Sequence, residues 1–467
     1  MLTVTNDIAQ LKALITDLHQ QNQQLRAKIT ELEARLTQNS SNSHRPPSWD
    51  GLAKKPAIQP ALPKDKTKKH GGQPGHRGDT LRMIPTPDHL ITHQAITCIE
   101  CGRLLTGLGQ LVVKRQVFDL PKPRLEVTEH QLLAHVCSCG CANQGQFPPA
   151  VAAPVQYGPR LKATSLVLNT DYRIPLHKLG TLWQQWVGQR VNTATLLTAQ
   201  GQAHKQLLPV ESHIKDQVVA AGVSHHDETG LRVGGKLQWG FVASTASYTH
   251  LFIHAKRGKE ALQSTDSVFE QCMGWTVHDC WASYFSVGKG RHALCGAHLV
   301  RELQALEDGG RLWAGAMKHH LLALYGQSRE GPLSGEARQQ AQLEYDRLLA
   351  QGDEQEYHLV FLDKQGRSTG QHWRSVGYAL LQRLDHRQAQ VLAFAFEPGV
   401  PFSNNQAERD LRHFKVKQRV SQCFRTDRGA AQYARLAGFL STMRKQGRNT
   451  FEQLTAVLDG SFTWAIT

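Results

Sequence analysis

The sequence has no long apolar run. None of its hydrophobic stretches approaches the roughly 20 residues that a helix needs to span a bilayer. The N-terminus also lacks the order of basic, apolar and small residues that marks a secretory signal. These absences argue against a membrane-spanning or secreted protein, and we expect the chain in the cytoplasm, without a membrane partner.

The sequence is also short of acidic residues. Asp and Glu number 39 against 54 Lys and Arg, which gives a formal net charge of +15 and an isoelectric point near 9.5. Such an imbalance favours a polyanionic partner, because basic surfaces release counterions when they bind nucleic acid. With 467 residues, the chain is long enough for two to four domains of ordinary size.

The cysteines are too unevenly placed for a disulfide framework. There are nine, and five of them lie between Cys98 and Cys141. Two thiolate pairs on separate turns can complete a tetrahedral site for structural Zn²⁺ in a small β-rich unit. The predicted ligands are Cys98, Cys101, Cys137 and Cys139. Cys141 is then the spare cysteine, and unligated thiols are the alternative.

From Ile8 onward the apolar residues follow a seven-residue repeat. The two sets of core positions are Ile8, Ile15, Asn22, Ile29 and Leu36, and Leu11, Leu18, Leu25 and Leu32. β-Branched residues in the first set with Leu in the second favour a parallel two-stranded coiled coil, in which Asn22 fixes the register. Residues 1–38 are therefore predicted to dimerise the chain. The alternative is one amphipathic helix packed on its own domain.

The composition then changes twice. Residues 39–80 are rich in Pro and basic residues, which predicts a linker or a DNA-contacting arm. Residues 81–155 hold the clustered cysteines and, over 115–135, an alternation typical of the strands of a ribbon. Residues 156–215 are helical in pattern with a turn at Gly188, which fits either helix-turn-helix DNA binding or an ordinary helical hairpin.

From Val218 the pattern becomes that of strands. Three consecutive strands with a turn at Gly234 and Gly235, a helix near Gly258 and a fourth strand predict a mixed sheet covered by helices. We divide this part of the chain into the first part of an α/β domain at 216–307, a helical insertion at 308–396, and the remainder with C-terminal helices at 397–467.

Three acidic residues stand where metal-dependent phosphoryl transfer would need them. Asp227 in VSHHDETGLRV and Asp279 in WTVHDCWASY close short β-like runs, and Glu408 in PFSNNQAERDLRHFKVKQR opens a helix. Carboxylates that converge from different elements can hold two Mg²⁺ ions beside a phosphodiester. The alternatives are a turn residue at Asp227 and an N-cap at Asp279.

The helix that begins near Asn404 or Asn405 is predicted to have a polar and an apolar stripe. The polar stripe is Glu408, Arg412, Lys415 and Arg419, and the apolar stripe is Ala407, Leu411 and Phe414. The apolar stripe would dock the helix on the sheet. The predicted contacts to a DNA backbone are Arg412, Lys415, Lys417 and Arg419. The alternative is a surface salt bridge between residues one turn apart.

Several segments resemble one family of proteins. The run VPFSNNQAERDLRHFKVKQRVSQCFRTDRGA closely resembles the third catalytic segment of bacterial insertion sequence 66 family transposases. DETGLRV, VHDCWASYF and HALCGAHLVREL resemble the segments that precede it. GGQPGHRG, the paired-cysteine unit ending in FPPAVAAPVQYGP, and PLHKLGTLW resemble the family's linker, zinc-binding domain and central helical domain. The resemblance covers most of the chain.

The resemblance implies a multidomain α/β protein with a ribonuclease H-like catalytic domain. Its Asp-Asp-Glu triad falls on Asp227, Asp279 and Glu408, with Mg²⁺ as cofactor and Mn²⁺ as a substitute. It also implies binding to double-stranded DNA, both the terminal inverted repeats of a mobile element and the target. A homodimer or higher oligomer, small accessory proteins of the same element and a place at the bacterial nucleoid are expected with it. Two departures are the shortened CSC and Cys280 directly after the second acid.

We therefore expect a DNA transposase that cleaves the ends of an insertion sequence and transfers the strands into target DNA. Asp227 is expected to bridge both ions. Glu228 and His226 are less suited as ligands, because adjacent strand residues point to opposite faces. The alternative is a catalytically inactive DNA-binding protein, acting as a repressor or structural factor. A guided nuclease with the same fold is a third alternative, but the sequence has no recognisable guide-binding module.

Overall fold

The computed structural model describes Leu11, Leu14, Ile15, Leu18 and Ile29, and residues 81–148, 150–356, 358–362 and 368–464. Over 358–362 and 368–374 the backbone alone is described. The five N-terminal residues are helical, and each is more than half exposed. The rest of the predicted coiled coil and the predicted linker at 39–80 lie outside the described residues. Within the described part of the chain, every helix is too short or too polar to pass through a lipid bilayer.

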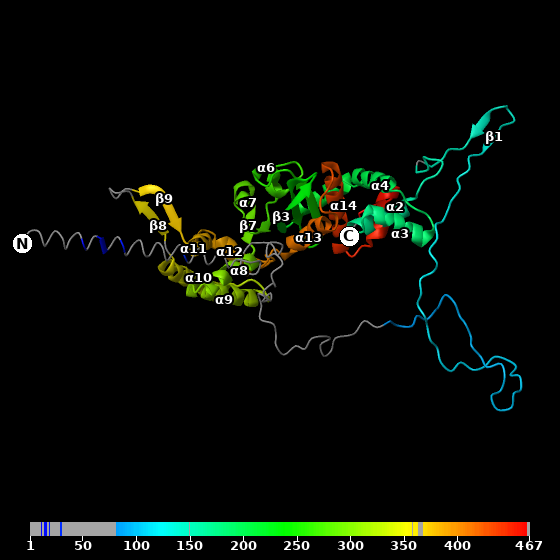
Figure 1. Cartoon of the computed structure of the whole chain (residues 1–467), viewed down its shortest axis with the longest axis horizontal. Coiled ribbons are helices and arrows are strands. Elements are labelled where there is room, and N and C mark those ends of the chain that lie inside the picture. The colour runs from blue at the N-terminus through cyan, green and yellow to red at the C-terminus, as the bar shows by residue number, and fades with distance from the viewer. Residues whose placement is uncertain are drawn as a thin grey trace, which may run out of the picture.

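Residues 81–158 run outside the compact part of the molecule, and this segment includes a projecting hairpin (Figure 1). The hairpin consists of β1 (Ala134–Val136) and β2 (Ala142–Gln144), which pair antiparallel. The ribbon predicted over 115–135 is wrong except at its end. The residues before β1 are extended without a strand partner, because side-chain alternation gives a strand only where a second backbone completes the ladder.

Four helices follow. They are α2 (Pro159–Thr170), α3 (Leu176–Val187), α4 (Thr193–Gln206) and α5 (Leu208–Val219). Gly188 ends α3 with a φ of 76°, a left-handed conformation that glycine adopts without strain. Asn192 caps α4 by accepting from the Ala194 N–H at 2.9 Å. The helical hairpin around Gly188 therefore forms, and the apolar faces of α2, α4 and α5 pack against the C-terminal helices.

A five-stranded mixed sheet lies at the centre of the molecule. Its strands are β3 (Val223–Val233), β4 (Lys236–Ser244), β5 (Thr249–His254), β6 (Trp275–His278) and β7 (Arg291–Leu294). Their order is β5-β4-β3-β6-β7. The first three are antiparallel neighbours, and β3, β6 and β7 run parallel. The predicted mixed α/β architecture is confirmed.

Short elements fill the connections between these strands. They are α6 (Lys259–Leu262), the 3₁₀ helix η2 (Phe269–Gln271) and α7 (Ala282–Val287). The β3–β4 hairpin turns at Gly234 and Gly235, whose φ values of 55° and 80° are those of the two-residue turn that matches strand twist.

β3 differs from its predicted course. The apolar run before it belongs to α5, which ends at Val219, and β3 begins only at Val223. The strand then runs through Asp227 to Val233, so Asp227 lies inside a strand and does not close one. A change of partner explains this, since pairing with β6 stops at His225 while pairing with β4 continues from there.

A helical insertion separates β7 from the last helices. It consists of α8 (Gly296–Asp308), α9 (Leu312–Ser328), α10 (Gly335–Gln355), β8 (His358–Leu362), β9 (Ser368–Arg374), α11 (Val376–His386) and α12 (Gln388–Phe396). Its own core is built around buried Trp313 and Tyr345. The β8–β9 hairpin interrupts the helices and was not predicted (Figure 1).

Three C-terminal helices complete the fold, namely α13 (Asn405–Ser421), α14 (Asp427–Lys445) and α15 (Thr450–Asp459). α13 packs on β3 and β4, and α14 packs on β5. The predicted apolar stripe Ala407, Leu411 and Phe414 is buried there, in a cluster with Leu231 and Val242. Gly240 is required beneath α13, because a Cβ at that position would lie 2.7 Å from the Phe414 ring.

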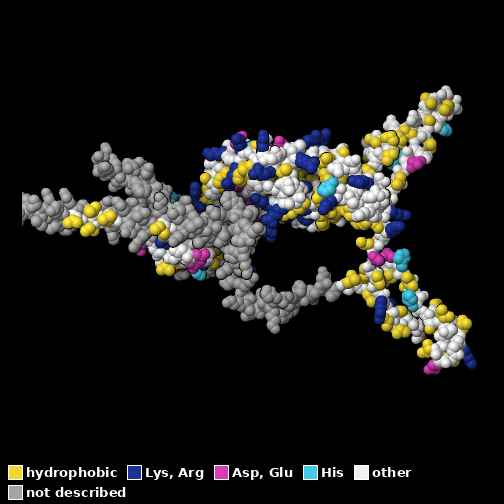
Figure 2. Space-filling model, in the orientation of Figure 1, with side chains coloured by type: hydrophobic (Ala, Val, Ile, Leu, Met, Phe, Trp, Pro, Cys, Tyr) yellow, Lys and Arg dark blue, Asp and Glu magenta, His cyan; other side chains and the backbone are white. Residues whose placement is uncertain are grey.

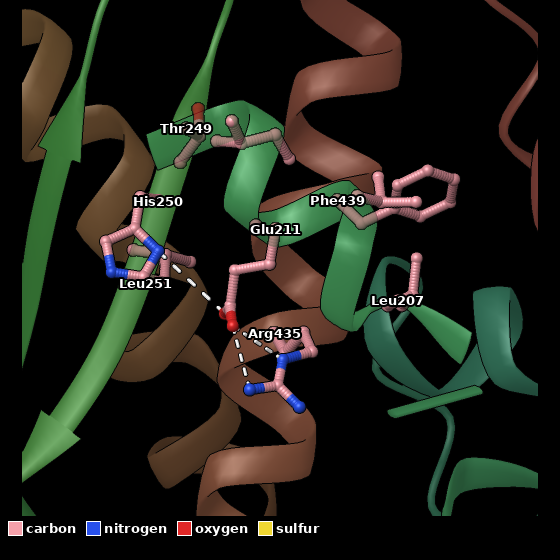
Figure 3. A pocket seen from close by; sticks show the side chains of 10 residues that line it. Leu207, Glu211, Thr249, His250, Leu251, Arg435 and Phe439 are labelled. Atoms are coloured by element: carbon pink, nitrogen blue, oxygen red, sulfur yellow. Dashed lines mark hydrogen bonds and ion pairs between the residues drawn. The ribbon is translucent and has the colours of Figure 1, made fainter. Parts of the chain in front are cut away.

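A largely buried ion pair joins α5 to α14, beside His250 of β5 (Figure 3). Glu211 of α5 accepts from Nε and Nη2 of Arg435 of α14, both at 2.8 Å. His250 of β5 lies on the other side, with its Nδ1 3.9 Å from Glu211. Burial raises the pKa of Glu211, and Arg435 opposes that shift. Burial also lowers the pKa of His250 to about 3, so this ring is neutral near pH 7 and Arg435 supplies the balancing charge.

We predict that Arg435→Met destabilises the protein by roughly 3 to 5 kcal/mol, because it leaves Glu211 charged and buried without a partner. Urea-induced unfolding at neutral pH measures the loss. The matched control is Arg347→Met, which breaks the exposed pair with Glu344 and should cost less than about 1 kcal/mol. Equal losses in the two variants would contradict the structural importance of the buried pair.

Candidate active site

Two acidic residues occupy the same level of neighbouring strands. In the parallel pairing of β3 with β6, the last paired rung joins His225 to Val277. Asp227 and Asp279 each follow two residues later. Continued register therefore places them side by side on strands that are spaced about 4.8 Å apart. β6 ends at His278, so Asp279 follows directly after the strand while Asp227 still lies within β3.

Alternation along β3 separates Asp227 from its neighbours. Glu228 accepts from Arg257 Nε at 2.9 Å and from the Tyr284 hydroxyl at 2.6 Å, and its side chain is 1% exposed. His226 is also buried, with its ring edge-on to Phe269. These contacts lie on the face of the sheet opposite to α13. The geometry agrees with the sequence argument that Glu228 and His226 do not share the face of Asp227.

Glu408 approaches the two aspartates from the other side. It lies in the first turn of α13, and its N–H donates to the Asn404 carbonyl at 3.2 Å. The same helix packs on Val242, the cross-strand partner of Asp227. Oε1 of Glu408 is 3.8 Å from Nε2 of His298 in α8. The fold thus brings an acid from residue 408 to the same face as Asp227 and adds a histidine that the sequence did not single out.

Asn404 fixes the start of α13 against β3. Its Nδ2 donates to the His226 carbonyl at 2.7 Å, and its Oδ1 lies 3.0 Å from Nδ1 of His225. Its backbone N–H donates to Sγ of Cys295 at 3.1 Å. Asn404 takes the predicted N-cap position, but its side chain makes no capping bond. The paired asparagines in the sequence indicate the start of the helix. No local pattern reveals that Asn404 bonds to the backbone of His226, because the two residues are far apart along the chain.

Burial and repulsion disfavour the charged form of Asp227. Burial raises the pKa of Asp227 well above its ordinary value, and the charges of Glu228, Asp279 and Glu408 raise it further. Asp227 is therefore within electrostatic range of both other acids. Burial lowers the pKa of Lys415, and the charge of Asp227 opposes that shift, so Lys415 is also within electrostatic range of Asp227. Carboxylates perturbed in this way are often found at functional sites, but as placed these three do not stand close enough to share one ion.

The chain reverses directly after Asp279. Cys280 has a φ of 77°, an uncommon value for a residue with a side chain, which costs on the order of 1 to 3 kcal/mol. Oδ1 of Asp279 accepts from the Trp281 N–H at 3.0 Å, and the Cys280 N–H donates to Nδ1 of His278 at 3.2 Å. Helix α7 begins only at Ala282, so Asp279 is not its N-cap. These contacts hold the Asp279 carboxylate at the end of the strand.

The predicted basic residues of α13 do not share one surface. Arg412, Lys415 and Arg419 are exposed on the side of Glu408. Lys417 is half-buried on the opposite side of the helix, with its Nζ 5.4 Å from the centre of the Tyr433 ring. Lys and Arg side chains are spread over the visible face of the compact part of the molecule, with few Asp or Glu among them (Figure 2).

The predicted zinc ligands lie on two separate turns. A hydrogen bond from the Cys101 backbone lowers the pKa of Cys98, and one from the Cys139 backbone lowers the pKa of Cys137. Such bonds favour thiolates. The Cys137 N–H also donates to the Cys141 carbonyl at 2.8 Å, which closes the hairpin. Across the described ranges, no three His, Cys, Asp or Glu side chains stand close enough to hold a metal ion as they are placed.

We predict that Asn404→Ala destabilises the protein by roughly 1 to 3 kcal/mol, because the buried His226 carbonyl loses its donor. Unfolding by urea measures the change. Asn405→Ala is the control at the next position, since Asn405 is exposed and should change stability by less than about 0.5 kcal/mol. A loss confined to Asn405→Ala would contradict the importance of the bond from Asn404 to the His226 carbonyl.

We predict that Asp227→Asn stabilises the metal-free protein at pH 7.5. The pKa of Asp227 is raised in the fold, so the folded state is destabilised relative to the unfolded state once the pH is high enough to ionise this carboxyl. Asparagine stays neutral and avoids that loss. The stability gained by the substitution should shrink as the pH falls towards about 3.9, the pKa of an ordinary aspartate. Melting temperatures in EDTA across this range test the sign, and a variant less stable than the parent at pH 7.5 would contradict it.

Two family models match parts of the chain. A family model described as "Transposase IS66 family" matches residues 154–432, which include all three acidic residues. A second model, described as a family of unknown function (DUF6444), matches residues 3–82. No curated protein matches the chain. Because the first match covers more than half of the sequence, the chain belongs to the Transposase IS66 family.

Proposed function

We propose that this transposase cleaves the ends of an insertion sequence and transfers the strands into target DNA with an Asp-Asp-Glu site. Asp227, Asp279 and Glu408 are the proposed catalytic residues. The observation that supports the proposal is their placement. Asp227 in β3 and Asp279 directly after β6 each follow the last paired rung by two residues, and Glu408 lies on the helix that packs on the Asp227 face. The order β5-β4-β3-β6-β7 supports a ribonuclease H-like domain.

The chemistry of the three side chains suits a divalent cation, but as placed in the described residues they do not stand close enough to hold one together. They supply carboxylate oxygens, which Mg²⁺ and Mn²⁺ prefer, and their mutual repulsion raises the pKa of Asp227 and would be relieved by a bound cation. Two such ions, when bound, stabilise the attacking and leaving oxygens of a phosphodiester. Asp227 interacts electrostatically with both of the other acids and is the proposed bridging residue.

The remaining groups position the substrate. Arg412, Lys415 and Arg419 project on the same side of α13 as Glu408 and would hold the DNA backbone while water, and then a DNA 3′-hydroxyl, attacks phosphorus. In each step a new phosphorus–oxygen bond forms as the bond to the leaving 3′-oxygen breaks. Asn404 and the reversal at Cys280 keep Glu408 and Asp279 in place, so little reorganisation is required of the protein.

Other parts of the chain have supporting roles in this proposal. Residues 1–38 would dimerise the chain, and the exposed helical side chains of Leu11, Ile15 and Leu18 are those that a partner helix would cover. Cys98, Cys101, Cys137 and Cys139 would hold structural Zn²⁺, which would draw their two turns together. Small accessory proteins of the same element would take part in strand transfer.

We predict that the parent protein cuts duplex DNA carrying the element's ends in the presence of Mg²⁺, and that Asp227→Asn lowers the rate by roughly 10³-fold or more. A metal ion in such a site is worth several kcal/mol, and each 1.36 kcal/mol is a tenfold change in rate. Gel analysis of single-turnover cleavage measures the rate.

Glu260→Gln is the control, since Glu260 is an exposed acid on α6, and it should leave the rate unchanged. If the parent binds the DNA but never cuts it, the catalytically inactive repressor or structural factor becomes the better description. If Asp227→Asn cuts as fast as the parent, the assignment of the three acids is wrong.

A further inference from the structure

We infer that Arg173, Lys417 and Arg444, grouped around the buried ring of His413, form a second binding site for DNA backbone phosphates. This group, called the His413 cluster below, lies where the loop after α2 meets α13 and α14. The inference rests on the proposed DNA substrate and extends it to a surface on the other side of α13. The argument has four parts, which are hydrogen bonding, charge, position and accessibility.

The hydrogen bonding leaves donors without good acceptors. Nη2 of Arg173 is 3.1 Å from Nδ1 of His413, and Nη2 of Arg444 is 2.9 Å from Nε2 of the same ring. Burial and nearby cations lower the pKa of His413 to about 3, so the ring is neutral near pH 7. A neutral imidazole has one acceptor nitrogen and one N–H. At least one guanidinium nitrogen therefore faces an N–H of the ring instead of an acceptor, so the cluster is not fully satisfied by its own hydrogen bonds.

A second donor supports this conclusion. Nε of Arg173 is buried without a hydrogen-bond partner among the described residues. The guanidinium is held in place because Nη1 donates to the Thr170 and Asp171 carbonyls, and Arg173 itself has a φ of 64°. A strained backbone that fixes an arginine with unused donors is typical of a functional position. Guanidinium groups bind phosphate oxygens with the geometry that these donors offer.

The charge is not balanced within the cluster. Asp171 pairs with Arg444, and Asp410 pairs with Lys445 at 2.8 Å. Among the described side chains, this leaves Arg173 and Lys417 without a carboxylate of their own in the His413 cluster. Burial and the charge of Arg173 both lower the pKa of Lys417, as expected for cations crowded together. A bound anion would relieve this repulsion.

The position of the cluster suits a long polyanion. At about 100° per residue, Lys415 lies almost directly above Glu408 on α13, whereas Lys417 is on the opposite side. The two surfaces are separated by about the diameter of a helix, 10 to 12 Å. One DNA strand presents a phosphate about every 3.4 Å along its axis, so a strand that passes over α13 can reach both surfaces. A duplex would then contact the protein beside the acids and again at the His413 cluster.

The cationic groups are accessible from outside. The side chain of Arg444 is 42% exposed, in contrast to 8% for its partner Asp171. Arg173 and Lys417 are half-buried, and the ring of Tyr433 lies under the Lys417 amine. The cluster therefore has a buried base formed by His413 and Tyr433 and an open rim of positive groups. Its expected ligand is the phosphodiester backbone of double-stranded DNA, bound without sequence preference.

The test is metal-free DNA binding by the full-length protein. In EDTA, the affinity for a labelled duplex of arbitrary sequence is measured by fluorescence anisotropy at several salt concentrations. Lys417→Gln and Arg173→Gln should each weaken binding several-fold on all sequences and reduce the slope of log affinity against log salt by about 1. Lys417→Arg keeps the charge and should keep the parent's slope. Lys259→Gln removes an exposed cation on α6 and should change neither quantity.

Unchanged affinity and slope in both Gln variants would overturn the inference, and so would a parent protein that does not bind duplex DNA. If Arg173→Gln fails to fold, as judged by circular dichroism, Lys417→Gln alone decides. The result is separable from the catalytic proposal. Cleavage that survives Asp227→Asn would remove the catalytic assignment without affecting the salt slopes, and normal slopes in the Gln variants would remove this second site without affecting the catalytic assignment.

Discussion

The parallel pairing of β3 with β6 determines where the two proposed catalytic aspartates lie. Two residues after the last paired rung, each strand carries an aspartate on the same face, so the distance between Asp227 and Asp279 follows from the spacing of neighbouring strands. A slip of one residue in this pairing would turn one carboxylate to the other face, where Arg257 and Tyr284 already hold Glu228. The rest of the site depends on this register.

The third acid depends on a different kind of constraint. Glu408 follows a helical insertion with its own core, so its place is fixed by contacts with residues that precede that insertion. Asn404 makes those contacts through the backbone of β3 and the thiol of Cys295, and the apolar stripe of α13 seals the sheet beneath them. The site thus combines a pair of acids set by strand register with a third set by side-chain hydrogen bonds.

Much of this could be predicted from the sequence where the signal was local. The strand pattern gave the mixed sheet, the Gly234-Gly235 turn and the apolar stripe of α13. The ribbon predicted from the alternation over 115–135 is largely absent, because a strand needs a partner strand and the sequence does not identify one. The sequence predicts that a strand ends at Asp227. In the structure β3 changes its partner at His225 and continues to Val233, and a single sequence does not reveal such a change of partner. The role of Asn404 and the burial of Lys417 beside Tyr433 could not be found, since both arise from residues that are distant along the chain.

The contact between Glu211 and Arg435 has a mechanical consequence. Separating α5 from α14 would leave two desolvated charges unpaired, so the N-terminal helices and the central sheet resist being pulled apart. The ion pair therefore holds the position and angle of α5 relative to α14.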